Sequence, residues 1–187
     1  MIHRTLLIAA AIIASVAITA CSDTTAPKKV VPGLPAAAIL APHPGPATVV
    51  ATINGGGTAD MEVPQGLLAG RTVFGIGVKL LSDGSATGHF DCVDQHGDSP
   101  GFPGNIFGEI ISWSTEGANN EIIVLNVIGK FLPIPGGHPG PALFTVKIQQ
   151  FGGAGVGQWT LEVPTPQGPF IVCYELLTSG QIVYRLA

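Results

Sequence analysis

The segment RTVFGIGVKLL, residues 71–81, alternates between two kinds of residue. Its large apolar residues share one face of an extended chain, and its glycines and lysine share the other: Phe74, Ile76, Val78 and Leu80 against Gly75, Gly77 and Lys79. A period of two is typical of a β-strand that places one face in a hydrophobic core. The segment therefore predicts a half-buried strand.

The same alternation recurs along the chain in LFTVKIQQF, residues 143–151, and in GQWTLEV, residues 157–163. In the latter, Trp159 and Leu161 oppose Thr160 and Glu162. Further strands are predicted at residues 48–53, 86–94, 106–114, 121–132, 170–177 and 181–186. About nine strands with short links and no amphipathic helix predict an all-β fold, a single antiparallel β-sandwich or small barrel. Trp113 and Trp159 fall at inward strand positions and are expected in the core.

The overall composition agrees with this fold class. Among 187 residues, 26 glycines and 16 prolines interrupt long helices. The formal net charge is −4, and the eight Lys and Arg residues are scattered and form no basic stripe. We therefore expect no nucleic-acid partner. A nucleophile-elbow motif and a dinucleotide-binding glycine pattern are both missing from the sequence, so we expect no cofactor and favour a non-catalytic protein.

The N-terminus reads as a signal peptide over residues 1–20, with His3 and Arg4 ahead of an apolar run. The run ends in ITAC, residues 18–21, which resembles the lipobox of bacterial lipoproteins. The resemblance implies that Cys21 carries a thioether-linked diacylglyceryl group and further acyl chains such as palmitate, which anchor the protein to a membrane. Ser22 follows in place of an inner-membrane retention aspartate, which favours the outer membrane of the cell envelope over the inner one.

Residues 21–47 form a predicted tether between this anchor and a folded domain at residues 48–187. Six prolines lie in the tether: Pro27, Pro32, Pro35, Pro42, Pro44 and Pro46. Because proline fixes φ and removes a hydrogen-bond donor, an extended chain is expected here. At about 3.1 Å per residue, such a chain reaches roughly 80 Å.

The folded part is similar to a type of uncharacterised bacterial secreted β domain. Members of this type share a glycine triplet, a Phe-Gly-x-x-Val-Lys strand and a Gly-His-aliphatic-x-x-x-Asp strand. The matching residues here are Gly55, Gly56, Gly57, Phe74, Gly75, Val78, Lys79, Gly88, His89 and Asp94. The resemblance implies an all-β fold and brings no activity with it.

One stretch, GHFDCVDQHGDSPG at residues 88–101, gathers residues that could bind a metal. On a strand, His89 and Asp91 share the polar face, and His96 and Asp98 follow in a loop. With His138, these side chains are the candidates for a metal site, although the stretch lacks the ligand order of a zinc or EF-hand site. A solvated strand face that runs into a polar loop is the interpretation we prefer, so we predict no metal.

With Cys21 lipidated, Cys92 and Cys173 remain as an even pair in an oxidising compartment. A disulfide between them is one possibility, and two separate buried thiols are the other. Alternation places Cys92 on a face with Phe90 but Cys173 on a face with Glu175, which suggests that the second strand presents Cys173 on a polar face and speaks partly against a bridge.

Three classes of function follow from the sequence. The first is a lipid-anchored envelope protein whose β domain is a structural or protein-binding module. The second is a barrel that carries a small apolar ligand. The third is a hydrolase or isomerase that uses the region of His89, Asp91 and His96. We favour the first class, with an envelope protein as partner.

Overall fold

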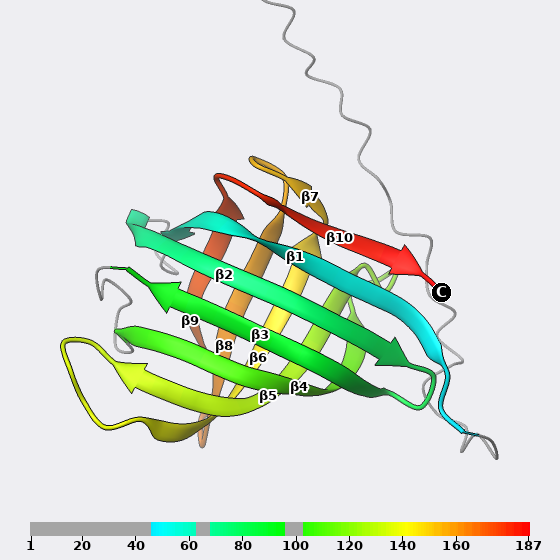
Figure 1. Cartoon of the computed structure of the whole chain (residues 1–187), viewed down its shortest axis with the longest axis horizontal. Helices are drawn as coiled ribbons and strands as arrows, with labels where there is room; N and C mark the ends of the chain where they lie inside the picture. The colour runs from blue at the N-terminus through cyan, green and yellow to red at the C-terminus, as the bar shows by residue number, and fades with distance from the viewer. Residues whose placement is uncertain (1–45, 63–67, 96–102) are drawn as a thin grey trace, which may run out of the picture.

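The computed structural model describes residues 46–62, 68–95 and 103–187 (Figure 1). The predicted signal peptide, Cys21 and nearly all of the tether lie outside these residues. The described part is all-β, as predicted, and its ten strands form one antiparallel sheet. In that part of the chain, no helix has the length and hydropathy needed to span a bilayer. The strands are β1 (Val49–Glu62), β2 (Leu68–Leu81), β3 (Ser85–Asp94), β4 (Gly104–Glu116), β5 (Ile122–Pro133), β6 (Gly140–Gln150), β7 (Gly152–Gly153), β8 (Gln158–Thr165), β9 (Gly168–Leu177) and β10 (Gln181–Leu186).

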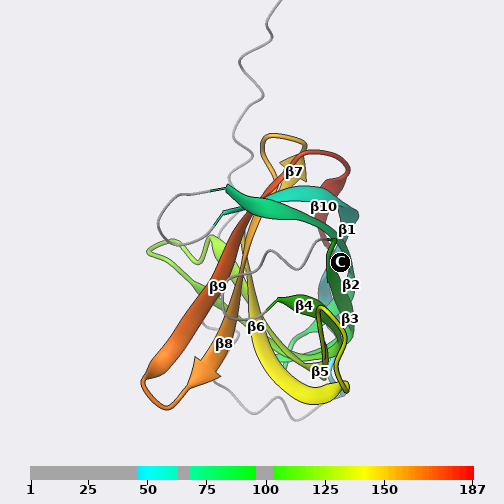
Figure 2. The ribbon, with the colours of Figure 1, turned by 90° about the vertical axis from the view of Figure 1, so that its left-hand side faces the viewer.

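The sheet closes into a ring through β1. Along one edge, β1 pairs with β2; along the other, it pairs first with β10 over residues 51–56 and then with β9 over residues 59–62. The neighbours β2-β3-β4-β5-β6-β8-β9 complete the circuit. Figure 2 shows the ring flattened, with β1, β2, β3 and β10 facing β6, β8 and β9. This closed sheet is compatible with the predicted sandwich or small barrel.

The glycine triplet explains why β1 is longer than the six-residue run expected at residues 48–53. The turn between β9 and β10 passes directly over Gly57, and Thr178 and Ser179 both donate backbone N–H groups to the Thr58 carbonyl, at 2.8 and 3.1 Å. A Cβ at Gly57 would lie 2.1 Å from the Ser179 carbonyl oxygen, and its φ of 153° is one that other residues rarely adopt. Glycine therefore lets β1 continue beneath this turn. The structure has one strand more than the nine predicted. This strand is β7, whose two residues pair with β10.

The core fills the space between the two sides of the ring. As the alternation predicts, Phe74, Ile76, Val78 and Leu80 are buried, and so are both tryptophans. Four aromatic rings meet at its centre. Trp159 lies 5.1 Å from Phe90 and 5.5 Å from Phe74 between ring centroids, and Phe90 lies 6.3 Å from Phe144. Tilted and edge-on aromatic contacts of this kind add to the stabilisation from buried area.

The outer face of β8 is less exposed than its polar residues suggest. Thr160 and Glu162 lie opposite Trp159 and Leu161, as predicted, yet both are buried. Lys147 of the neighbouring β6 lies over them, and its Nζ is 3.1 Å from Glu162 Oε1 and 3.0 Å from Glu116 Oε2. A long lysine side chain can cover a sheet surface while its charge is paired at the tip.

Candidate functional site

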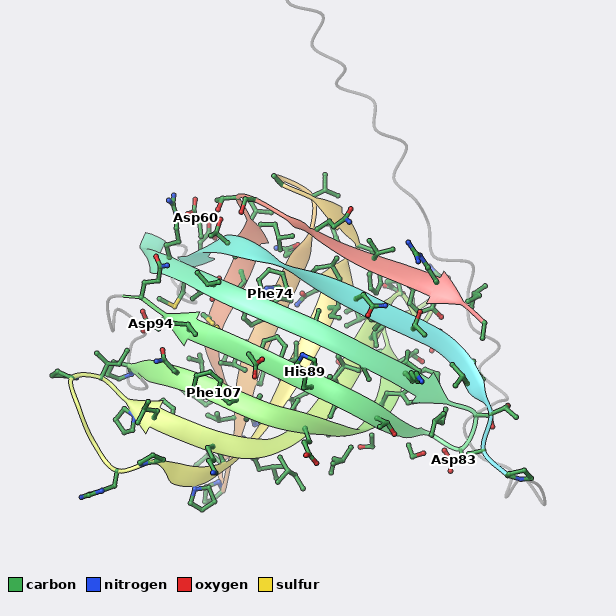
Figure 3. The ribbon with its side chains drawn as sticks, in the orientation of Figure 1. Asp60, Phe74, Asp83, His89, Asp94 and Phe107 are labelled. Carbon is green, nitrogen blue, oxygen red and sulfur yellow. The ribbon has the colours of Figure 1, made fainter. Side chains whose placement is uncertain are left out.

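The structure separates the residues of the 88–101 stretch by face. Phe90 and Cys92 point into the core, and His89 is exposed on the outer face of β3 (Figure 3). His138 is exposed in the segment between β5 and β6, whereas His96 and Asp98 lie outside the described residues. Among the residues that the structure describes, no group of three or more His, Cys, Asp or Glu side chains is placed to hold a metal ion.

Cys92 and Cys173 are both buried, and both are unbridged in the structure. One prediction about Cys173 is wrong. The face of β9 that carries Cys173 and Glu175 was expected to be polar and to be turned toward solvent. That face points into the ring, and Glu175 has 0% of its surface exposed. The reason is that β9 pairs with β1 on one side and with β8 on the other, so that both neighbours fix its inner face toward the core.

Glu175 is the centre of a polar cluster inside the ring. We define the Glu175 cluster as Glu175, Cys173, Thr72, Cys92 and Asp94. Thr72 on β2 donates its hydroxyl hydrogen to Glu175 Oε2 at 2.9 Å, although the two residues are 103 positions apart. Thr72 and Asp94 are directly paired across β2 and β3. Figure 3 shows Asp94 at the same end of the strands as Asp60, far from Asp83.

The surroundings of Glu175 favour its protonated form. Burial raises the pKa of the carboxyl most strongly, and the negative charges of Asp94 and Asp60 raise it further. Hydrogen bonds with Thr72 and Cys173 act in the opposite direction, and the pKa settles at about 7. A carboxylic acid that is half protonated near neutral pH can therefore take up or release a proton inside the core.

Burial also raises the pKa of both thiols well above their ordinary value, and the nearby Glu175 raises each further. Because the thiolate is the reactive form, both cysteines are expected to be inert in the folded protein. The cluster therefore keeps both thiols protonated and offers no activated thiolate.

We predict that a thiol reagent at pH 8 modifies neither Cys92 nor Cys173 in the native mature protein, and modifies both after unfolding without reductant. The physical reason is the low thiolate fraction and the burial of both sulfur atoms. Intact-mass analysis counts the modified thiols. A denatured protein that takes up no label at these positions would instead establish the disulfide, and rapid labelling of the native protein would contradict the buried thiols.

Sequence reasoning missed the Glu175 cluster because β9 gives no clear alternation. Its inner residues Cys173 and Leu177 flank Glu175, but Val172, the residue before Cys173, is buried as well. A register shift opposite Leu161 and Glu162 accounts for this, since it adds one residue to β9. One sequence signal could have indicated the buried glutamate: on its own face of the strand, its neighbours are a cysteine and a leucine.

The outer surface carries a second feature, an apolar strip across β4, β5 and β6. We define the β4–β6 strip as Phe107, Ile111, Ile128 and Leu143, which are 40%, 43%, 52% and 53% exposed. Ile128 is directly paired with Leu143 on one side and with Glu109 on the other. Each strip residue points outward beside an inward neighbour that is buried, as Leu143 does beside Phe144.

No family model, curated protein or solved structure compared with the chain matches it. Two features of its geometry bear on function. The Glu175 cluster can exchange a proton within the core, and the β4–β6 strip can contact an apolar surface of another molecule.

Proposed function

We propose that this protein is a lipid-anchored component of a bacterial cell envelope whose β domain is non-catalytic and binds an envelope protein through the β4–β6 strip. The observation that supports the proposal is the strip itself, four large apolar side chains that are 40% to 53% exposed on adjoining strands. Single scattered apolar residues are normal on a protein surface, but several large ones gathered on neighbouring strands of one sheet face, two of them directly paired, are typical of an interaction site.

The surroundings of the strip support a protein partner. Glu109 lies between Phe107 and Ile111 on β4 and is paired with Ile128, and Lys130 is paired with Phe107, so that exposed charges of both signs lie among the apolar residues. Protein–protein interfaces combine apolar contacts with polar and charged groups. Aromatic side chains fill the centre of the closed sheet. This packing favours binding at the outer surface over the alternative, an apolar ligand bound inside.

The predicted features of the N-terminus support the membrane-anchoring part of the proposed function. A lipidated Cys21 holds the chain at the membrane, with the outer membrane favoured, and the proline-rich tether lets the domain meet a partner at a distance from the bilayer. A single acyl chain anchors only weakly, whereas two or more anchor stably.

Envelope fractionation combined with site-specific photo-crosslinking tests the proposal. We expect the protein in the outer-membrane fraction, and we expect a photo-reactive residue at position 128 to give one discrete crosslinked protein. The crosslink should be reduced by about tenfold or more in the Leu143→Asp variant, because a charge in the centre of an apolar interface is strongly unfavourable. Position 87 on β3, where Thr87 is exposed, is the matched control and should give no such species.

Three results would contradict the proposal. A Cys21→Ser variant that stays in the membrane fraction would rule out the lipid anchor. A crosslink that is equally strong from position 87 would rule out the strip as the interface. A small molecule that co-purifies in place of any partner would favour the carrier function.

A further inference from the structure

Among the residues that the structure describes, three buried side-chain polar atoms have no hydrogen-bond partner: the indole Nε1 of Trp159, the Oε1 of Glu175 and the hydroxyl of Tyr184. The first two belong to neighbouring strands. Both residues are almost fully buried, at 1% and 0% exposed. Leaving a buried polar atom without a partner is unfavourable, and most such atoms in folded proteins are hydrogen-bonded. Of the Trp159 and Glu175 atoms, one is a donor and the other is an acceptor when the carboxyl is charged.

The fold brings these two side chains next to each other. Trp159 and Glu175 are directly paired residues of β8 and β9, and both point into the ring. Directly paired residues have Cβ atoms about 5 Å apart. Both side chains then cross the interior to the same strand, since Trp159 contacts Phe74 and Glu175 accepts a hydrogen bond from Thr72, two residues earlier on β2. They therefore run side by side, yet Nε1 and Oε1 form no direct bond.

We propose that Trp159 Nε1 and Glu175 Oε1 together bind one buried water molecule. The indole N–H donates to the water oxygen, and the water donates to Oε1 when the carboxyl is charged. When the carboxyl carries its proton on Oε1, that proton is donated to the water instead. A buried water requires two to four polar partners, and these two atoms meet that requirement in both protonation states.

The water would connect Trp159 to the charge state of Glu175. The titratable and charged groups that face this carboxyl are Asp94 from β3, Asp60 from β1 and the thiols of Cys92 and Cys173. Both thiols stay protonated up to high pH because burial raises their pKa. Glu175, whose pKa is about 7, is expected to change charge near neutral pH. The buried water depends neither on the partner nor on the lipid anchor proposed above.

Solution NMR of the full mature chain with ¹⁵N-labelled tryptophan tests the proposal, because the sequence has two tryptophans and hence two indole signals. Trp113 is the internal control, since its Nε1 donates directly to the Leu81 carbonyl at 2.8 Å. We expect a cross-relaxation signal to a long-lived water at the Trp159 indole N–H and none at that of Trp113. We also expect the Trp159 indole shift to move in one step near pH 7, and this step to be lost in Glu175→Gln.

Two results would overturn the proposal. If the Trp159 indole shift titrates but shows no contact with water, the indole bonds Glu175 directly. If neither the water signal nor the titration step is present in the wild-type chain, the two atoms do not share a ligand. Both measurements are made on the wild-type protein, so the conclusion does not depend on the folding of the variant.

Discussion

Replacing Glu175 with glutamine is expected to remove a decrease in folding stability that the wild-type protein shows between about pH 4.5 and pH 7. The folded-state pKa of this carboxyl is about 7, against an ordinary value of 4.5. Between these values, the folded protein keeps the proton and the unfolded chain releases it. Stability that is fully present below pH 4.5 is therefore lost as the pH rises through the folded-state pKa.

The size of the effect follows from the same pKa difference. At about 1.4 kcal/mol per pKa unit, a carboxyl raised from 4.5 to about 7 contributes up to about 3 kcal/mol. Total stabilities of single domains are about 5–15 kcal/mol, so the loss is a large part of the whole. Glutamine keeps an oxygen for the Thr72 hydroxyl bond and cannot ionise, so the slope between pH 4.5 and 7 is expected to disappear.

Urea unfolding at several pH values between 4 and 8 measures this difference. Glu109→Gln is the matched control, because Glu109 is an exposed carboxyl on the outer face of β4 and its replacement should leave the slope unchanged. If wild type and Glu175→Gln show the same pH dependence, then Glu175 ionises in the folded protein as it does in water, and the buried cluster is misplaced.

Phe90→Ala is expected to destabilise the domain by about 3–5 kcal/mol, the usual range for removing a buried phenylalanine side chain. Phe90 is 1% exposed and contacts both Trp159 and Phe144 at the centre of the ring. Its removal leaves a cavity between the two sides of the flattened sheet, and neither side can close on it without shifting a strand. Chemical unfolding gives the difference in free energy directly.

Phe107→Ala is the control for this prediction, since the same side chain lies on the outer face of the adjoining strand and is 40% exposed. It is expected to change stability by about 1 kcal/mol or less. Phe90→Leu, which leaves a smaller cavity, should be intermediate and provides a folded protein if the alanine variant does not fold. Equal losses of stability from the alanine variants at positions 90 and 107 would mean that the assignment of one position to the buried face and the other to the exposed face is wrong.

The strands and their inner faces could be predicted because alternation is a local property. Phe74, Ile76 and Val78 are spaced two residues apart, and a strand with this spacing has one apolar face wherever it lies. The exposed position of His89 beside the buried Phe90 follows from the same rule and was also predicted. The lipobox at Cys21 is equally local, and its lipidation stays a prediction because the residue lies outside the described part of the chain.

The Glu175 cluster could not be predicted, because Glu175 on β9 is distant in sequence from Thr72 on β2 and Asp94 on β3. Glu175 meets the other two only after β1 has joined β9 to β2 and closed the sheet. The β4–β6 strip has the same origin, since the pairing of Ile128 with Leu143 depends on strand register. Sequence alone therefore determined which residues form strands and which side of most strands is apolar, because both depend on neighbours along the chain. Only the tertiary structure decided that a glutamate lies in the core and that four apolar residues adjoin on the surface, because ring closure and register are set by contacts between distant segments.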